Sequence, residues 1–287
     1  MRYIEFEKVA DTVESLCIAA GYELPEDVVA AVERAAQRES NPAAVKILNQ
    51  LIENARTAKV ESIPLCQDTG LAVVFVECGS DTAISPPEGN ERATLTDAIN
   101  AGVAAGYRKG YLRKSVVAEP LNKRENTGSN TPAIIHYTIV PGQKLKLSVM
   151  LKGGGCENKS QFRMFRPADQ RQQIIEWVVD VVKSAGADAC PPFIVGVGIG
   201  GDFELSCLLS KKALIRNLNQ RNSDKFYAEL EDDLLSAINT QGPGPQGLGG
   251  DTTALGCLVE TAPCHIASLP VAVNIECHSH RHKTEVI

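Results

Sequence analysis

Residues 133–155 read AIIHYTIVPGQKLKLSVMLKGGG, and this stretch decides the fold class. Two runs rich in β-branched, aromatic and aliphatic residues flank Pro141-Gly142, which predicts two strands joined at that dipeptide. The second strand runs into a glycine triplet, where the backbone can approach a ligand closely because glycine has no Cβ. Two successive strands without a helix between them interrupt any regular alternation of strand and helix.

The rest of the chain mixes strands and helices in the same irregular way. Buried-strand patterns occupy residues 71–79, 192–201 and 265–277. Helical periodicity covers residues 93–112, 168–186, 204–218 and 225–242, and a loop rich in glycine and proline follows at 242–256. This order predicts an α+β fold with mixed sheets and helices rather than a doubly wound parallel sheet.

The first 60 residues are predicted to be helical. Helical patterns cover residues 6–21, 25–39 and 41–60, and Asn41 is a candidate cap with Pro42 at the first helical position. The chain has no internal repeat and no low-complexity linker. We therefore expect a single domain over residues 1–287, with a helical lead-in over 1–60.

Composition excludes several classes of function. Hydrophobic residues make up 44% of the 287 residues, the net charge is -6 and aromatics are only 5%, so a nucleic-acid-binding surface is not expected. No apolar run approaches the 18 residues that span a membrane, and the first residues lack the apolar core of a signal peptide. We expect a cytoplasmic protein that binds neither nucleic acid nor membrane.

Nine cysteines are many for a chain in a reducing compartment, where such a set favours metal binding or catalysis over disulfides. No two of them form a CxxC pair, so a metal site must collect single cysteines from distant loops. Cys66, Cys190 and Cys277 lie in three separate loops. They suit a [4Fe–4S] cluster with one iron left without a protein ligand, which could act as a Lewis acid on a substrate hydroxyl.

Other motifs leave alternatives open. The GxGxxG pattern at Gly196–Gly201 lies within a strand, so a dinucleotide site is weakly indicated. The KGGGCENKS segment lacks the GxxxxGK[ST] pattern of a phosphate loop. A non-catalytic zinc protein could use Cys264, His265 and Cys277 with the tail histidines, although a solvated tail is the simpler interpretation of CHSHRH.

Seven motifs occur in a fixed order over about residues 60 to 280. They are CQDTG, LRKSVVAEPL, NTGSNTPA, KGGGCENKS, ACPPFIVGVGIGG, GPQGLGGDTTALG and HIASLPVAVNIEC. In this order the chain closely resembles the alpha subunit, or N-terminal region, of class I iron–sulfur fumarate hydratases. It also resembles their sister family, the L-tartrate dehydratase alpha subunits.

The resemblance implies an oxygen-sensitive [4Fe–4S] hydro-lyase whose cluster is held by Cys66, Cys190 and Cys277. The implied substrate contacts are Gln67, Asp68, Arg113 and the backbone of Gly153, Gly154 and Gly155. Asp68 and His265 are the implied catalytic groups, which orient the hydroxyl and move its proton. Without the resemblance, the residues alone favour a structural role for both: Asp68 as a cap or turn acceptor and His265 as a core histidine.

The implied reaction is the reversible hydration of fumarate to L-malate. Arg113 and the glycine-loop amides could stabilise the charge that grows on the substrate carboxylate when the C3 proton leaves. The family places its catalytic base in a second domain, which in two-subunit members is a separate beta chain. We therefore expect an alpha subunit that is inactive alone, with a beta partner and an alpha–alpha dimer.

The substrate has an alternative. NTGSNTPA and ENKS resemble fumarate hydratases, whereas Cys156 after the glycine triplet resembles tartrate dehydratases. We expect fumarate, and dehydration of L-tartrate to oxaloacetate is the alternative.

Overall fold

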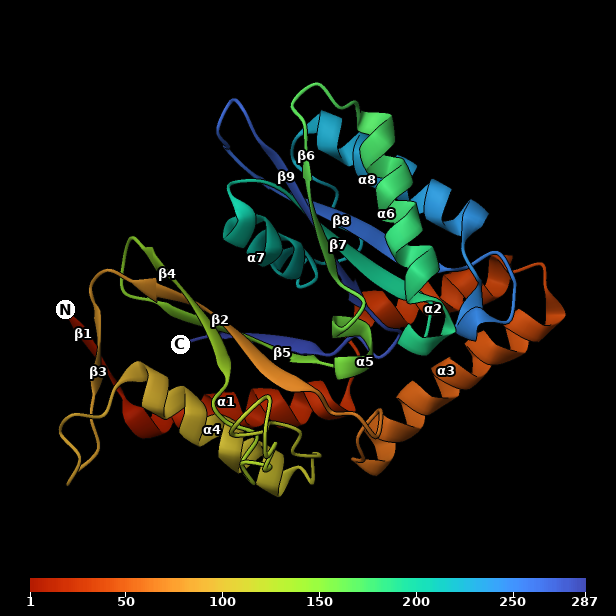
Figure 1. Cartoon of the computed structure of the whole chain (residues 1–287). Helices are drawn as coiled ribbons and strands as arrows, with labels where there is room; N and C mark the ends of the chain where they lie inside the picture. Colours follow the sequence, from red (N-terminus) through yellow and green to blue (C-terminus); the bar gives the residue numbers. More distant parts are fainter. The chain divides into compact units, whose positions relative to one another are not determined.

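The computed structural model describes residues 1–287 and has an α+β fold, as the sequence predicts (Figure 1). The chain divides into two compact units. Unit 1 comprises residues 1–25, 55–153 and 281–287, and unit 2 comprises residues 26–54 and 154–280. The predicted helical lead-in forms three helices but belongs to both units, because α3 (Pro42–Glu61) passes from unit 2 into unit 1. None of the helices combines the length and the hydropathy that a membrane span needs.

Unit 1 is built on a four-stranded sheet with the order β10-β5-β2-β4. Its elements are β1 (Arg2–Glu5), α1 (Phe6–Tyr22), β2 (Leu71–Gly79), β3 (Thr82–Ser85), α4 (Leu95–Lys109), β4 (Ile134–Val140), β5 (Leu145–Lys152) and β10 (His282–Val286). The strands β1 and β3 form a separate parallel pair. Helices α1 and α4 pack closely at Gly106, where a Cβ would lie 2.8 Å from the Cβ of Cys17.

The two strands predicted on either side of Pro141-Gly142 both form, but they are not neighbours. Strand β2 lies between them, parallel to β4 and antiparallel to β5. The burial of each strand explains this order. All five residues from Ala72 to Val76 of β2 are buried, whereas β4 is mostly exposed, which suits an edge strand.

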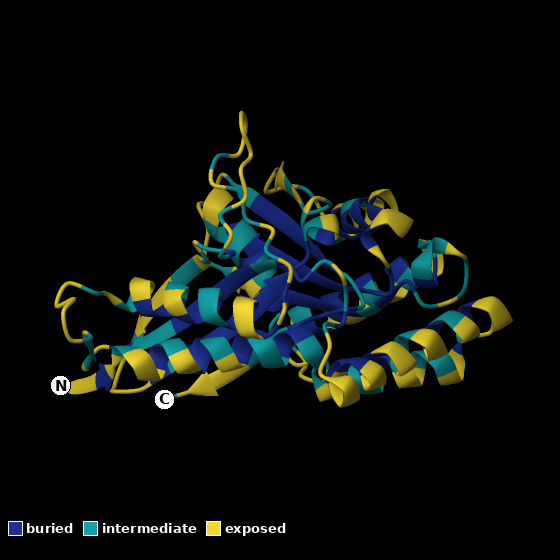
Figure 2. Ribbon diagram, turned by 90° about the horizontal axis from the view of Figure 1, so that it is seen from below, coloured by how far each residue is buried: buried dark blue, intermediate teal, exposed yellow.

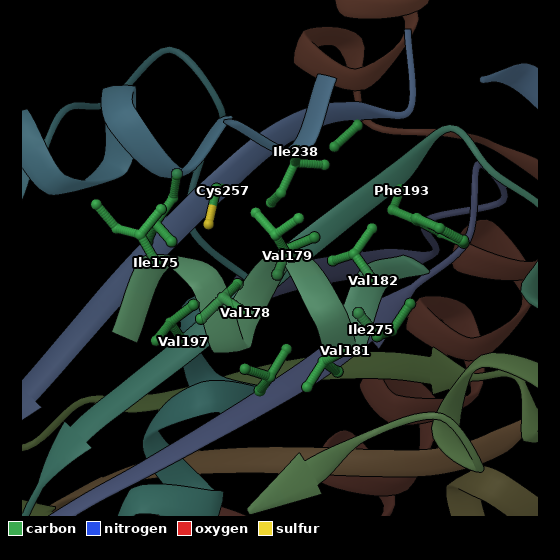
Figure 3. Close-up of a cluster of buried hydrophobic side chains, with 14 of the residues drawn as sticks. Ile175, Val178, Val179, Val181, Val182, Phe193, Val197, Ile238, Cys257 and Ile275 are labelled. Atoms are coloured by element: carbon green, nitrogen blue, oxygen red, sulfur yellow. The ribbon is translucent and has the colours of Figure 1, made fainter. Parts of the chain in front are cut away.

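Unit 2 is built on a second sheet with the order β6-β9-β7-β8. Its elements are α2 (Glu26–Arg38), α5 (Gly154–Glu157), β6 (Gln161–Phe165), α6 (Arg171–Ala185), η1 (Ala187–Ala189), β7 (Phe193–Gly200), α7 (Phe203–Ala213), α8 (Lys225–Gln241), η2 (Pro245–Gly247), β8 (Ala254–Ala262) and β9 (Leu269–Glu276). Figure 3 shows the core of this unit, in which Val178, Val179 and Val182 of α6 pack near Ile275 and Phe193.

The glycines of the GVGIGG stretch serve helix packing. A Cβ at Gly196 or Gly198 would lie 2.0 Å from the carbonyl oxygen of Ser210 or Ser206, so α7 can lie on β7 only because both positions are glycine. The pattern therefore has a structural explanation, and the weakly indicated dinucleotide site is not needed. Figure 2 shows that the helices alternate buried and exposed residues and that burial differs between strands: inner strands such as β2 and β7 are mainly buried, whereas edge strands such as β4 and β10 are mostly exposed.

Candidate active site

The CQDTG loop, residues 66–70, connects α3 to β2 in unit 1. The backbone N–H of Gly70 donates to Oδ1 of Asp68 at 2.9 Å, which closes the loop as an Asx turn. Gly70 has a φ of +76°, and a Cβ there would lie 2.5 Å from the carbonyl oxygen of Lys152. The loop therefore requires glycine at its end. It leaves Cys66 half-buried and Gln67 exposed.

Hydrogen bonds from polar side chains fix this loop within unit 1. The hydroxyl of Thr69 donates to the carbonyl of Arg113 at 2.9 Å, and Nδ2 of Asn130 donates to the carbonyl of Gly70 at 3.2 Å. Burial raises the pKa of the Tyr107 phenol well above its usual value, so it stays protonated and donates to the carbonyl of Thr69 at 3.0 Å. These bonds bring the predicted LRKS and NTGSNTPA segments beside the CQDTG loop.

Arg281 is a functional candidate that the sequence pattern did not indicate. Its side chain is 1% exposed, and Nη1 donates to the carbonyl oxygen of Asp68. The expected solvated tail of His278, His280 and His282 is wrong. His280 is fully buried, and residues 282–286 form β10, because the edge of β5 supplies backbone partners for them.

Cys190 and Cys277 lie at the same end of the two central strands of the unit 2 sheet. Strands β7 and β9 are antiparallel with Ile194 opposite Glu276, so the start of β7 lies beside the end of β9. The backbone N–H of His278 donates to the carbonyl of Cys190 in a long hydrogen bond of 3.4 Å. Cys190 is exposed and Cys277 half-buried, so both can present a thiol to a bound group.

The turn that carries Cys190 is held in an uncommon conformation. Cys190 has φ 57° and ψ 65°, the left-handed region that non-glycine residues adopt only when their surroundings fix it. Gln246 of η2 provides part of that support, because its backbone N and its Nε2 donate to the carbonyl of Pro191 at 2.8 and 2.7 Å. The GPQGLGG motif therefore supports the cysteine turn.

A third thiol and a carboxylate lie next to Cys277. Sγ of Cys156 lies 3.3 Å from Oε1 of Glu276, and the same oxygen lies 3.8 Å from Sγ of Cys277. All three ligand atoms lie within 4.8 Å of one another. Cys156 is 3% exposed and Glu276 is fully buried. The sequence pattern did not single out Glu276.

The glycine triplet leads into α5, and α5 is fixed to its neighbours by polar contacts. Glu157 forms an ion pair with Lys211 of α7, and it accepts a hydrogen bond from Nδ2 of Asn274 at 3.3 Å. The hydroxyl of Ser160 accepts from the backbone N of Ile275 at 3.3 Å. The turn after Gly154 is therefore held on α7 and on the end of β9.

Four other cysteines have thiols with a raised pKa. Burial raises the pKa of the Cys17 thiol to about 12 and raises that of Cys257 still further. Burial also raises the pKa of Cys78 and of Cys207. A raised pKa disfavours the thiolate that binds metals, and none of these four thiols lies in a group of ligand atoms such as that of Cys156, Glu276 and Cys277, so they are poor candidates for metal binding.

His265 lies apart from the paired cysteines. It is exposed in the turn between β8 and β9, where its Nδ1 accepts from the backbone N of Ala267 at 3.1 Å. Cys277 follows the other end of β9, and at about 3.3 Å per residue the 8-residue strand separates them by roughly 25 Å. The structure therefore does not bring His265 to Cys277 within one chain.

The predicted site residues fall into two groups, one in each unit. Unit 1 holds Cys66, Gln67, Asp68, Arg113 and Gly153. Unit 2 holds Gly154, Gly155, Cys190, His265 and Cys277.

Comparison with known proteins agrees with these motifs. Residues 10–286 match the family described as Fumarate hydratase (Fumerase). A protein of Methanocaldococcus jannaschii described as "Putative L(+)-tartrate dehydratase subunit alpha" is 39% identical over 278 residues, which cover 96% of this chain and 95% of that protein. The L(+)-tartrate dehydratase subunit alpha of Escherichia coli strain UTI89 is 29% identical, with 96% and 90% covered.

Together, the fold and the match define a hydro-lyase, an enzyme that adds or removes water at a carbon–oxygen bond. The chain belongs to the fumarate hydratase (Fumerase) family. This membership overturns the alternative of a non-catalytic zinc-binding protein, and it makes the resemblance seen in the sequence a confirmed prediction.

Proposed function

We propose that this chain is the alpha subunit of a [4Fe–4S]-dependent hydro-lyase that hydrates fumarate reversibly to L-malate. The observation that carries the proposal is that the backbone at Cys190 lies beside the backbone that follows Cys277, 87 residues later in the chain, and that neither cysteine is buried. Thiolates are the ligands that iron–sulfur clusters require, so this donor set fits the group. Cys66, in unit 1, joins them by its match to the CQDTG motif of the family.

The chain's own residues have separate parts in this proposal. The cluster, when bound, would supply a Lewis-acid position for the substrate hydroxyl. Gln67 and Arg113 bind the dicarboxylate, and the amides of Gly153, Gly154 and Gly155 stabilise the charge that grows on its carboxylate. Asp68 orients the hydroxyl and moves its proton, and the Arg281 guanidinium fixes the Asp68 backbone.

The proposal includes two partners. The relatives are described as alpha subunits, which supports a beta subunit that brings the catalytic base. An alpha–alpha dimer would also provide a place for His265. Since His265 lies at the far end of β9 from Cys277, we assign its part in proton movement to the site of a second copy in this proposed dimer.

Dehydration of L-tartrate is the second candidate function. It is favoured by the descriptions of the relatives and by Cys156, which follows the glycine triplet. Both substrates are four-carbon dicarboxylates, so the same arginine and backbone amides would bind either one.

The experiment is co-expression with a beta-type chain, anaerobic cluster reconstitution and a comparison of fumarate, mesaconate and tartrate turnover. We expect a brown protein and the highest kcat/KM with fumarate. Cys66→Ser, Cys190→Ser and Cys277→Ser should each remove the visible absorbance, whereas Cys207→Ser should keep it. A colourless wild-type protein would overturn the proposal, and a preference for tartrate would replace fumarate with the second candidate.

A further inference from the structure

We propose that Cys156, Glu276 and Cys277 form a mononuclear site for a thiophilic divalent cation, of which Zn²⁺ and Fe²⁺ are the expected occupants. This site is different from the cluster, because it uses Cys156 and Glu276 and does not use Cys66 or Cys190. It lies wholly within unit 2, so its geometry depends on that unit alone.

The three side chains already stand at the spacing of metal ligands. Bond lengths of about 2.3 Å for sulfur and 2.0 Å for oxygen place tetrahedral ligands roughly 3.5 to 4 Å apart. Oε1 of Glu276 lies 3.3 Å from Sγ of Cys156 and 3.8 Å from Sγ of Cys277. Small shifts of these three side chains would therefore bring their ligand atoms to bonding distance of one cation.

Regular structure fixes the positions of these ligands. Glu276 ends β9, which pairs with β7 on one side and with β6 on the other. Cys156 lies in α5, which is held by the contacts of Glu157 with Lys211 and Asn274. The site is thus supported by the sheet and by an anchored turn, as a selective metal site requires.

The donor types select the class of cation. Two thiolates and one carboxylate suit borderline cations such as Zn²⁺, Fe²⁺ and Co²⁺, whereas Mg²⁺ and Ca²⁺ prefer oxygen ligands alone. Glu276 would supply the oxygen ligand from a fully buried position. Cys277 is half-buried and offers the route of entry. A fourth position would be left for water.

One consequence rests on the proposed function. If Cys277 is also a cluster ligand, then a cation bound to Cys156, Glu276 and Cys277 occupies a thiolate that the cluster needs. Zn²⁺ bound to the apo chain would then slow cluster assembly, and Cys156→Ser would relieve this inhibition.

The test is a titration of the full-length apo chain with Co²⁺ alone, under anaerobic conditions, followed by thiolate-to-Co²⁺ charge-transfer absorbance. We expect Cys156→Ser and Glu276→Gln each to weaken Co²⁺ binding by about tenfold or more. Cys66→Ser and Cys190→Ser should bind Co²⁺ as the wild type does. Cys264→Ser is the matched control for adventitious binding at an exposed thiol, and melting curves of every variant confirm folding.

A second readout uses the unaltered sequence, so it does not depend on any variant folding. Zn²⁺ should protect Cys277 from alkylation and leave Cys190 reactive, as mass spectrometry would measure. The proposal is overturned if Co²⁺ does not bind, if Cys156→Ser binds it unchanged, or if Cys190→Ser or Cys264→Ser abolishes binding. Failure of cluster reconstitution alone would overturn the proposed function and leave the cation site standing.

Discussion

At the scale of single residues, Gly70 is the position where the CQDTG loop tolerates no side chain. We expect Gly70→Ala to lower the free energy of unfolding by about 3 kcal/mol or more, because strain at positive φ adds to a clash with the carbonyl of Lys152. Gly128→Ala is the matched control. It has φ +73° with nothing within 4 Å of its Cβ, so it should cost only about 1 kcal/mol. Urea unfolding measures both, and equal losses would contradict the steric argument.

Gly155 is the opposite case, since the structure itself leaves room for a side chain. A Cβ there would meet only the carbonyl oxygen of Asp188, at 3.7 Å. We expect Gly155→Ala to leave the unfolding free energy unchanged or slightly higher. In the reconstituted enzyme it should lower kcat/KM by about tenfold or more, because the methyl group separates the backbone amides from the substrate. Unchanged kcat/KM would remove Gly155 from the substrate contacts.

At the scale of elements, α5 depends on Glu157 for its position. We expect Glu157→Gln to lower stability by about 1–3 kcal/mol, because it breaks a partly buried charged hydrogen bond to Lys211. The variant should also lose activity when it is fully folded. At such a temperature kcat/KM should still fall, since α5 carries the amides of Gly154 and Gly155. Glu229→Gln is the control, because the exposed pair of Lys225 and Glu229 should contribute less than about 1 kcal/mol. An equal loss of activity in the control would contradict the positioning role.

The helices could be predicted from the sequence, and the strands only in part. Each helix longer than one turn has local periodicity that the pattern captures. Strands β1 and β3 have four residues each, too few for a pattern. Strand β8 begins inside the expected loop at 242–256, and its apolar run does not alternate because most of the strand is buried. Strand β10 is polar and forms because β5 offers it an edge.

The motifs of the candidate site could be recognised in the sequence one by one, but the residues that support them could not. The cysteines and glycines stand out in short local patterns. Gln246, Arg281 and Glu276 act through contacts across 55, 213 and 120 residues of sequence, and no local spacing indicates such contacts. The same long-range pairing converts the expected solvated tail into a strand. The glycine spacing in β7 is explained by the packing of α7 on that strand. This reason, too, cannot be recognised until the position of α7 is known.

At the scale of the whole molecule, the chain crosses between its two units four times, after residues 25, 54, 153 and 280. Neither unit is a continuous segment, and unit 1 includes the last seven residues of the chain. Each unit is therefore assembled from segments that are separated in the sequence by parts of the other unit. Because of this connectivity, we expect the two units to unfold together as a single domain, although each unit has its own sheet.

The single-domain prediction can be tested with one probe in each unit. Trp177, the only tryptophan, lies on α6 and packs against Phe165, so its fluorescence reports on unit 2. Cys17 is fully buried in unit 1, and its alkylation in short pulses, quantified by mass spectrometry, reports on that unit. In urea, a single cooperative transition gives the same midpoint for both probes. Cys264, which is exposed, provides the control for changes in the alkylation rate itself. Midpoints that differ beyond error would contradict the prediction, because they would show that the two units unfold separately.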